Sequence, residues 1–255
     1  MKKLTEGFDK TKDFCDTHKL EINAHKTQLI IFKAPSKPSP DIELMLDGCL
    51  IKPISSVQLL GVTLDSHLTL APHIDNTIKK AHGLLGALAR AAPSLPRQLL
   101  KQAYTALIRS RLEYASAILA PAAKTHLKKL DVIQRSAARI IYGLPRDAHA
   151  APLLDELQLQ PLECRRNKHI VEIVESVLEN KCHPALTGMF EAGMDGRIHP
   201  KHVPRTALER KRFACVGAHV YNLDLDAQLK NLPREDEDAI DGVTGGDDGG
   251  VGEAV

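Results

Sequence analysis

Residues 20–32, LEINAHKTQLIIF, decide the fold of the N-terminal part because a polar corner here separates two different apolar patterns. Before the corner, apolar residues recur at helical spacing over residues 4–19, with Asp and Lys on the other face. After it, residues 28–33 (QLIIFK) are short, apolar and β-branched, which favours a strand. The stretch therefore predicts a helix, a corner and a strand in that order.

The corner concentrates hydrogen-bonding and titratable side chains, namely Asn23, Lys26 and Thr27. Such a density fits an active site. It equally fits a helix-to-strand corner in which Asn23 and Thr27 hydrogen-bond to loop backbone while Lys26 is solvated. The second interpretation is favoured by the absence of a neighbouring carboxylate pair.

Short strands follow the corner. Asp47-Gly48 stands between apolar residues 41–46 and 50–51, and Asp-Gly in this setting is a strong hairpin signal because both turn residues tolerate positive φ. Residues 57–64 (VQLLGVTL) read as one further strand. Together with residues 28–33, these segments predict a small antiparallel sheet.

The rest of the chain is predicted to be mainly helical. Apolar stripes at helical spacing run over residues 74–88, 100–112, 127–141 and 161–178. Periodicity fades over residues 191–234, which we expect to be an irregular extension. Residues 235–255 are acidic and Gly-rich and are expected to be a disordered tail. The predicted fold class is thus α+β, a small sheet followed by a helical bundle.

Charge is unevenly distributed along the chain, although the formal net charge is only +2. Residues 71–146 hold thirteen Lys and Arg against three carboxylates, whereas residues 235–255 hold eight carboxylates and no Lys or Arg. A basic helical segment of this kind predicts contact with nucleic-acid phosphates, while scarce aromatics favour a duplex backbone over stacked single strands. The candidate contact residues are Lys79, Lys80, Lys101, Arg109, Arg111, Lys128, Lys129, Arg135 and Arg139.

No residue pattern predicts a disulfide, a leader or a membrane span. The five cysteines are scattered and odd in number, and no CxxC occurs, which indicates a reduced protein. Met1-Lys2-Lys3 is followed by Leu4-Thr5-Glu6 instead of an apolar core, and no apolar run reaches the roughly 18 residues of a membrane helix. We expect an intracellular protein of the nucleus or cytoplasm.

One group of residues in the C-terminal part has the spacing of metal ligands. His199, His202, Cys215 and His219 form an H-x2-H…C-x3-H arrangement that zinc could use, but scattered polar residues explain it better. The expectation is therefore no metal site.

Several short motifs occur in an order that resembles one protein family. In chain order they are FC at 14–15, LEIN at 20–23, KT at 26–27, LGVTLD at 60–65, HI at 73–74, RLEYA at 111–115, IQR at 133–135 and ARIIYG at 138–143. Over roughly residues 4–180, their order and spacing resemble the C-terminal part of the reverse transcriptase of non-LTR retrotransposons of the LINE or jockey-like type. The family often has Trp where Phe14 and Leu70 stand, and this chain has no Trp.

The resemblance implies a division of the chain. Residues 1–68 would be the end of the palm, with a primer-grip-like strand at Leu60, Gly61 and Val62. Residues 69–150 would form a helical thumb that holds the primer–template duplex, and residues 151–190 a helical connector. The Lys of the polar corner, here Lys26, lies near the nucleotide site in that family.

The resemblance also implies that the catalytic pair of the family is missing. Its Asp-Asp hairpin lies just before the helix that opens this chain, and Met1 falls after it. Two-metal phosphoryl transfer needs close carboxylates to hold two Mg²⁺ about 4 Å apart. The alternatives here, Asp41, Glu43, Asp47 and Asp65, read as solvated residues at strand ends.

We therefore expect a reverse transcriptase fragment that grips a DNA or RNA–DNA duplex through its phosphates. It would have no catalytic residue and no bound cofactor, although the intact family uses Mg²⁺. A missing polymerase core is a further candidate partner. The alternative function is a non-catalytic helical interaction module or an inactive retroelement relic.

Overall fold

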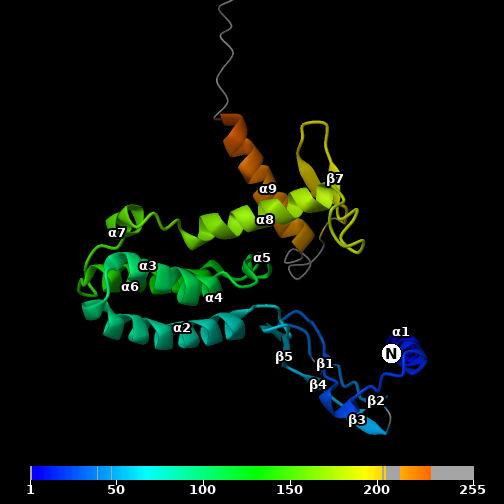
Figure 1. The fold of residues 1–255 in the computed structure, drawn as a ribbon. Helices are drawn as coiled ribbons and strands as arrows, with labels where there is room; N and C mark the ends of the chain where they lie inside the picture. Colours follow the sequence, from blue (N-terminus) through cyan, green and yellow to red (C-terminus); the bar gives the residue numbers. More distant parts are fainter. Residues whose placement is uncertain (1, 39, 47, 203, 205–212, 231–255) are drawn as a thin grey trace, which may run out of the picture.

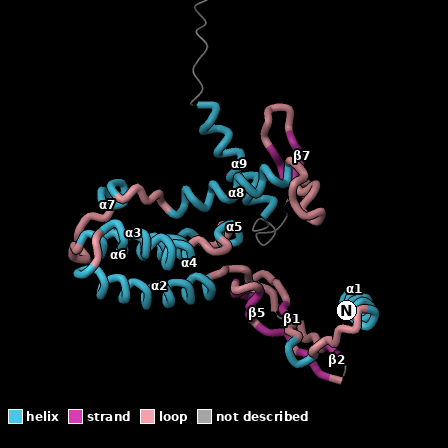
Figure 2. The backbone as a smooth tube through the Cα atoms, viewed as in Figure 1, coloured by secondary structure: helices cyan, strands magenta, loops and turns pink. Residues whose placement is uncertain are grey.

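The computed structural model describes residues 2–38, 40–46, 48–202, 204 and 213–230. Helices make up most of it, and the strands are short and occur in pairs (Figures 1 and 2). The prediction of an α+β fold is confirmed in this broad form. The expected disordered tail, residues 235–255, lies outside the described residues.

The N-terminal part follows the predicted order of helix, corner and strand. Helix α1 (Lys2–Thr17) leads into a 3-10 turn, η1 (Ala24–Lys26), and then into β1 (Leu29–Ile30). The strand is shorter than the predicted residues 28–33, and it pairs in parallel with β4 (Pro53–Ile54). This parallel pair was not predicted.

The Asp-Gly hairpin is confirmed. Strand β2 (Leu44–Leu46) pairs antiparallel with β3 (Cys49–Ile51), and Leu46 lies opposite Cys49 across the two-residue loop. Gly48 has a φ of 79°, the left-handed conformation that this turn requires, while Asp47 is outside the described residues.

The prediction of one strand over residues 57–64 is wrong. The segment folds back on itself as β5 (Ser56–Leu59) and β6 (Val62–Asp65), with Leu59 opposite Val62. Leu60 and Gly61 form the turn, and both have positive φ, 47° and 82°. A Leu in the left-handed region gives no local sequence signal, because turns of this type normally use Asn, Asp or Gly.

A single antiparallel sheet is likewise absent from the described residues, which contain four separate two-stranded ladders. The N-terminal core is small, with Leu44, Leu46 and Ile51 buried and Phe8 and Leu29 partly covering them. Two-stranded ribbons bury little apolar area by themselves, so this part has limited intrinsic stability.

The helical part is one bundle. Its elements are α2 (Ala71–Ala91), η2 (Ala92–Ser94), α3 (Arg97–Ala103), η3 (a π-helical segment, Tyr104–Arg109), α4 (Ser110–Leu112), α5 (Ser116–Leu119), α6 (Lys124–Tyr142), α7 (Ala151–Glu156) and α8 (Leu162–Leu178). The predicted start and stop signals hold, since Pro96 and Pro161 precede α3 and α8 and Gly143 ends α6 with a φ of 66°.

The bundle is built in layers. Figure 1 shows α2 below a layer that contains α3, α4 and α6, with α8 above it, and Figure 2 shows the same arrangement. The main core lies between α2, α3–α4 and α6, where Ile74, Tyr104 and Ile133 are fully buried. Leu157, Leu159 and Leu162 extend this core to the start of α8.

The region predicted to be irregular contains regular structure. Strand β7 (Phe190–Ala192) pairs antiparallel with β8 (Ile198–Pro200), and α9 (Phe213–Lys230) follows. These elements pack on α8 around Ile170, Val174 and Val177, which form a core separate from that of the bundle. The apolar pattern of α9 is spread around the helix rather than gathered in one stripe, which is why periodicity missed it.

Candidate nucleic-acid interface

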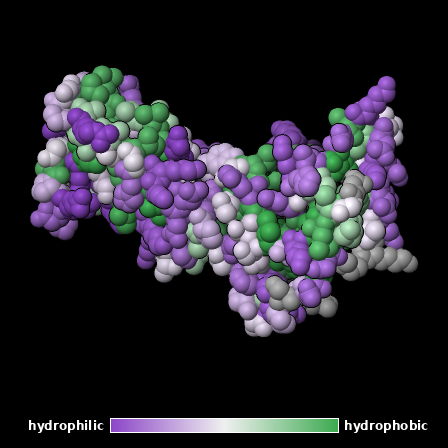
Figure 3. Space-filling view, turned by 90° about the horizontal axis from the view of Figure 1, so that it is seen from below, coloured by the Kyte–Doolittle hydropathy of each residue, from purple (hydrophilic) through white to green (hydrophobic). Residues whose placement is uncertain are grey.

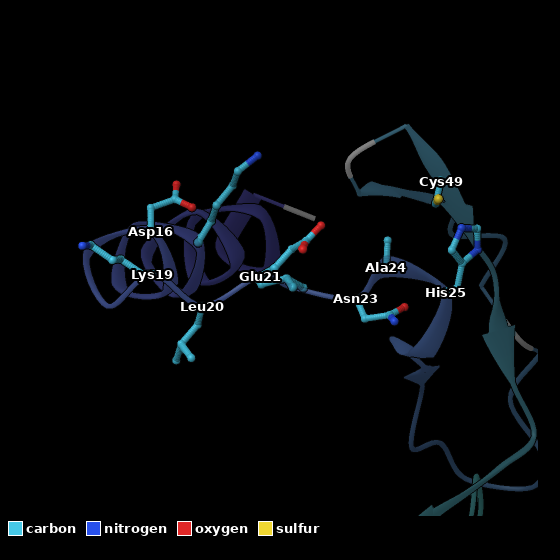
Figure 4. A pocket seen from close by; sticks show the side chains of 10 residues that line it. Asp16, Lys19, Leu20, Glu21, Asn23, Ala24, His25 and Cys49 are labelled. Atoms are coloured by element: carbon cyan, nitrogen blue, oxygen red, sulfur yellow. The ribbon is translucent and has the colours of Figure 1, made fainter.

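The polar corner forms a hydrogen-bonded turn. The Asn23 side chain accepts a hydrogen bond from the Lys26 backbone N–H (3.1 Å), and the Thr27 hydroxyl donates to the Asn23 carbonyl (3.0 Å). Lys26 is exposed. Asn23 and His25 line an open cavity of about 810 Å³ between α1 and this corner, where charged groups of both signs meet (Figure 4). This geometry matches the structural interpretation of Asn23, Lys26 and Thr27.

Of the candidate carboxylates near the strands, Asp47 lies outside the described residues, and the described ones belong to no group of three or more metal-binding side chains. Asp41 is exposed, and Glu43 forms an exposed ion pair with Lys52 at 2.9 Å. The interpretation of Asp65 as solvated is wrong, since its carboxylate is buried and accepts hydrogen bonds from the Thr69 hydroxyl and from the Thr69 and Leu70 backbone N–H groups. Burial alone would raise the pKa of Asp65, but these donors outweigh it and lower the pKa.

The primer-grip-like residues lie at the β5–β6 turn. Leu60 and Gly61 form its tip, whereas Val62 is buried and joins the main core. The tip touches the helical part, because the Tyr114 hydroxyl donates a hydrogen bond to the Leu60 carbonyl at 2.6 Å. Sequence reasoning missed this contact, which joins residues 54 positions apart.

Helices α2 and α6 lie side by side and run in the same direction. Near their starts, the Lys129 ammonium pairs with Asp75 at 2.8 Å, and near their ends Ala89 and Ile140 line one cavity. A groove of about 530 Å³ runs between them; it is lined by His82, Leu85, Gly86, Ala89, Val132, Ser136, Arg139, Ile140, Leu144 and Arg146. The two helices thus form one surface with basic side chains along it.

The structure brings part of the predicted contact set to this surface. Lys79, Lys80, Lys128 and Arg135 are exposed on α2 and α6, away from the buried stripe of each helix. Within the described residues, none of these four forms a salt bridge. Asp131, the one carboxylate of α6, is half-buried; burial raises its pKa, against the opposing effect of Arg166 and Arg135.

Three other candidates are engaged within the protein. The Arg139 guanidinium donates from Nε to the Ala148 carbonyl at 2.7 Å, and Lys129 is paired with Asp75. Arg109 lies 4.0 Å from Glu113, which also forms a two-pronged ion pair with Arg165.

The remaining two candidates lie on the α3–α4 side of the bundle. Lys101 is half-buried in α3, while Arg111 is exposed in α4, one turn before Tyr114. Arg146 was not a candidate, yet it lines the groove; its position after the Gly143 cap gave no helical signal.

The zinc pattern does not assemble. His199 lies on β8, His202 follows that strand, and Cys215 and His219 lie on α9. Across the described part of the chain, no three His, Cys, Asp or Glu side chains gather closely enough to hold a metal ion. A search of the same residues finds no helix with the length and apolar character needed to cross a bilayer.

Comparison with curated proteins finds polymerases of mobile elements. The chain is 27% identical over 169 residues to the RNA-directed DNA polymerase from mobile element jockey of Drosophila melanogaster, covering 61% of this chain and 18% of that protein. It is 25% identical over 167 residues to the probable RNA-directed DNA polymerase from transposon BS of the same species, with the same coverage. Identity with the jockey polymerase of Drosophila funebris is 30% over 149 residues, 56% of this chain and 16% of that protein.

No family model and no solved structure matches the chain. It spans less than a fifth of the length of the curated relatives above. The resemblance drawn from the motifs is confirmed: this chain is similar to part of the RNA-directed DNA polymerases of jockey-like, non-LTR mobile elements.

Proposed function

We propose that this chain is part of a retrotransposon reverse transcriptase and that its helical part grips a nucleic-acid duplex without supplying a catalytic centre. The relatives carry the name RNA-directed DNA polymerase, so their template and product are nucleic acids. The observation that carries the proposal is the set of exposed basic side chains on the parallel helices α2 and α6 that form no salt bridge with any described residue.

Electrostatics supports phosphate binding at this surface. Asp75 is paired with Lys129, and Asp131 is half-buried, so little negative charge opposes Lys79, Lys80, Lys128 and Arg135. Lysine and arginine that contact phosphates release condensed counterions, which gives affinity with little sequence preference. Lys129 and Arg139 of α6 belong to the same proposed contact region, while Lys101, Arg109 and Arg111 would be further contacts on the α3–α4 side of the bundle.

The hydrophobic cores fit the division implied by the resemblance only in part. Residues 1–68 would be the palm remnant, 69–150 the thumb-like bundle and 151–190 the connector. The main core runs from Val62 to Leu162, so the start of the connector packs with the thumb. The end of α8 shares its core with β7, β8 and α9, so these elements would belong with the connector.

The carboxylates near the strands favour a gripping role over a catalytic one. Asp65 fixes the start of α2, and Glu43 faces Lys52 on the surface of a hairpin. We therefore propose that Mg²⁺ and the reacting groups of the intact polymerase are held by residues outside this chain. Asn23, Lys26 and Thr27 would border that site without catalysing the reaction.

Exposed apolar side chains support a protein partner for the N-terminal part. Phe14, Met45 and Leu50 are each about half exposed or more. Figure 3 shows hydrophobic areas, in green, between hydrophilic side chains on one face of the molecule. We propose that the remaining polymerase core covers this surface, because large exposed apolar areas commonly mark interfaces.

The test is a salt titration of duplex binding. The full chain is titrated into a labelled RNA–DNA duplex, and the logarithm of the binding constant is plotted against that of the salt concentration. We expect tight binding at low salt and a steep negative slope. Replacing Lys79, Lys80, Lys128 and Arg135 with Gln should make the slope shallower by about 3 to 4, close to 0.9 for each lost contact.

The matched control replaces four exposed lysines elsewhere, Lys10, Lys37, Lys168 and Lys201, with Gln. It removes the same net charge and should change the slope far less. An equal change of the salt slope in the two variants would show that the duplex does not bind at the α2–α6 surface. A full chain that is monomeric, melts cooperatively and ignores nucleic acid would instead favour the helical interaction module or an inactive relic.

A further inference from the structure

We infer that Tyr114 is a positioning residue that fixes the β5–β6 turn to the helical bundle and so determines where the apolar tip of that turn stands. The inference rests on the proposed duplex-gripping function, which it extends to a residue that no motif singled out for this role. Its basis is a side chain-to-backbone contact between two parts of the chain that are distant in sequence.

The turn itself needs external support. Leu60 has a φ of 47°, and a non-glycine residue pays a conformational cost in this region. The side chains of Leu59 and Leu60 are 58% and 85% exposed, so they pack on little else in the molecule. Val62 and Leu64 of β6 pack on the main core, whereas the exposed tip has no such burial of its own.

Tyr114 supplies that support through both of its chemical parts. Its hydroxyl donates to the Leu60 carbonyl at 2.6 Å, which is the short distance of a strong O–H···O bond. Its ring lies against the bare face of Gly61, where an added Cβ would stand 3.4 Å from the ring carbon Cε1. Gly61 therefore serves twice, since its φ of 82° allows the turn and its missing side chain admits the ring.

Tyr114 is in turn rigidly placed. Leu112, two residues before it, is buried in the main core, and Ser116, two residues after it, is buried against His169 at 2.9 Å. The backbone between them turns sharply at Ala115, which has a φ of 54°. Arg111, three residues before Tyr114, is exposed in α4.

The test uses the conservative variant Tyr114→Phe, which keeps the ring against Gly61 and removes only the hydroxyl. Tyr142→Phe is the matched control, because it removes a hydroxyl from another face of the bundle. By hydrogen exchange of the full chain, Tyr114→Phe should accelerate exchange over residues 56–65 and leave residues 124–142 unchanged. Equal exchange of residues 56–65 in Tyr114→Phe and the unmodified chain would overturn the inference.

A second readout separates positioning from plain stabilisation. Tyr114→Phe should weaken binding of an RNA–DNA duplex by about three- to tenfold, the range expected for one hydrogen bond, with an unchanged salt slope. Leu60→Ala should weaken binding as well. If both residues act through the tip, the double variant should bind the duplex as tightly as the weaker-binding of the two single variants. Additive effects would contradict positioning.

The two arms also separate this inference from the proposed function. If the unmodified chain binds no duplex even at low salt, the proposed function fails, and the exchange experiment alone still decides whether Tyr114 holds the turn.

Discussion

His73 links the strands to the helical bundle at the scale of one residue. Its side chain is buried in the first turn of α2, where Nδ1 accepts a hydrogen bond from the Thr63 backbone N–H at 3.3 Å. Burial, aided by the charge of Lys80, lowers the pKa of His73. The folded state therefore holds the imidazole neutral, with its lone pair facing β6.

A pH dependence of stability follows from the sign of this shift. Because the folded-state pKa lies below the usual value of 6.5, the unfolded chain binds the proton more readily, and stability falls as pH drops from about 6.5 towards the folded-state pKa. Chemical unfolding of the full chain at pH 7.5 and pH 5.5 should reveal this loss. His73→Gln should reduce the pH dependence and cost about 1 kcal/mol at pH 7.5. The exposed His82→Gln serves as control, and an equal pH dependence in both variants would refute the role of His73.

Single residues also mark the limit of prediction from sequence. The choice of Asn23 and Thr27 as backbone hydrogen bonders was correct because their partners lie within four positions. Asp65 was misjudged because solvation depends on packing that only the folded chain provides. Arg139 was a candidate for phosphate contact, yet its Nε donates to Ala148 after the helix has ended.

At the scale of elements, a buried polar chain ties the bundle together. The Tyr104 hydroxyl in η3 donates to Gln134 Oε1 of α6 at 3.0 Å, and Gln134 Nε2 donates to the Gln160 carbonyl ahead of α8 at 3.0 Å. Tyr104 and Gln134 are almost fully buried, and burial raises the pKa of Tyr104. Three elements are thereby held in one relative position.

Removing one hydroxyl should weaken this arrangement measurably. Tyr104→Phe leaves Gln134 Oε1 buried without its donor, which should lower the free energy of unfolding by about 1–3 kcal/mol in chemical denaturation. Tyr221→Phe, a half-buried tyrosine of α9, should change it by less than about 0.5 kcal/mol. If the two variants lose similar free energy of unfolding, the hydrogen bonds of Tyr104 and Gln134 do not stabilise the bundle more than an ordinary tyrosine hydroxyl does.

Elements with a local signal were predictable, and those fixed by distant contacts were not. Apolar stripes, Pro96, Pro161 and Gly143 gave the long helices and several of their ends. The turn at Leu60 has no such signal, since Tyr114 holds it from 54 positions away. The parallel pairing of β1 with β4 is likewise a choice made between distant segments.

At the scale of the whole molecule, the uneven charge of the sequence has a spatial counterpart. Four basic residues of the middle segment, Lys79, Lys80, Lys128 and Arg135, are exposed on α2 and α6, the two helices that line a common groove. Sequence alone placed the charge on these helices but could not place the helices side by side. The Lys129–Asp75 ion pair joins residues 54 positions apart, so it too could not be predicted from the sequence.

That ion pair offers the most direct test of the proposed phosphate contact. Asp75 is the one carboxylate of α2, and it holds Lys129 at 2.8 Å on the exposed surface. An exposed pair contributes at most about 1 kcal/mol, so Asp75→Asn should leave stability nearly unchanged while it frees Lys129 and removes a negative charge. An increase in affinity cannot arise from misfolding, which makes the sign of the change informative.

The measurement compares the salt dependence of RNA–DNA duplex binding by the full chain, by Asp75→Asn and by the exposed control Asp41→Asn. The proposed interface predicts that Asp75→Asn binds more tightly at low salt and that its slope steepens by up to about one, with Asp41→Asn close to the unmodified chain. Unchanged or weaker binding by Asp75→Asn, in a protein of unchanged stability, would contradict phosphate contact at the α2–α6 surface.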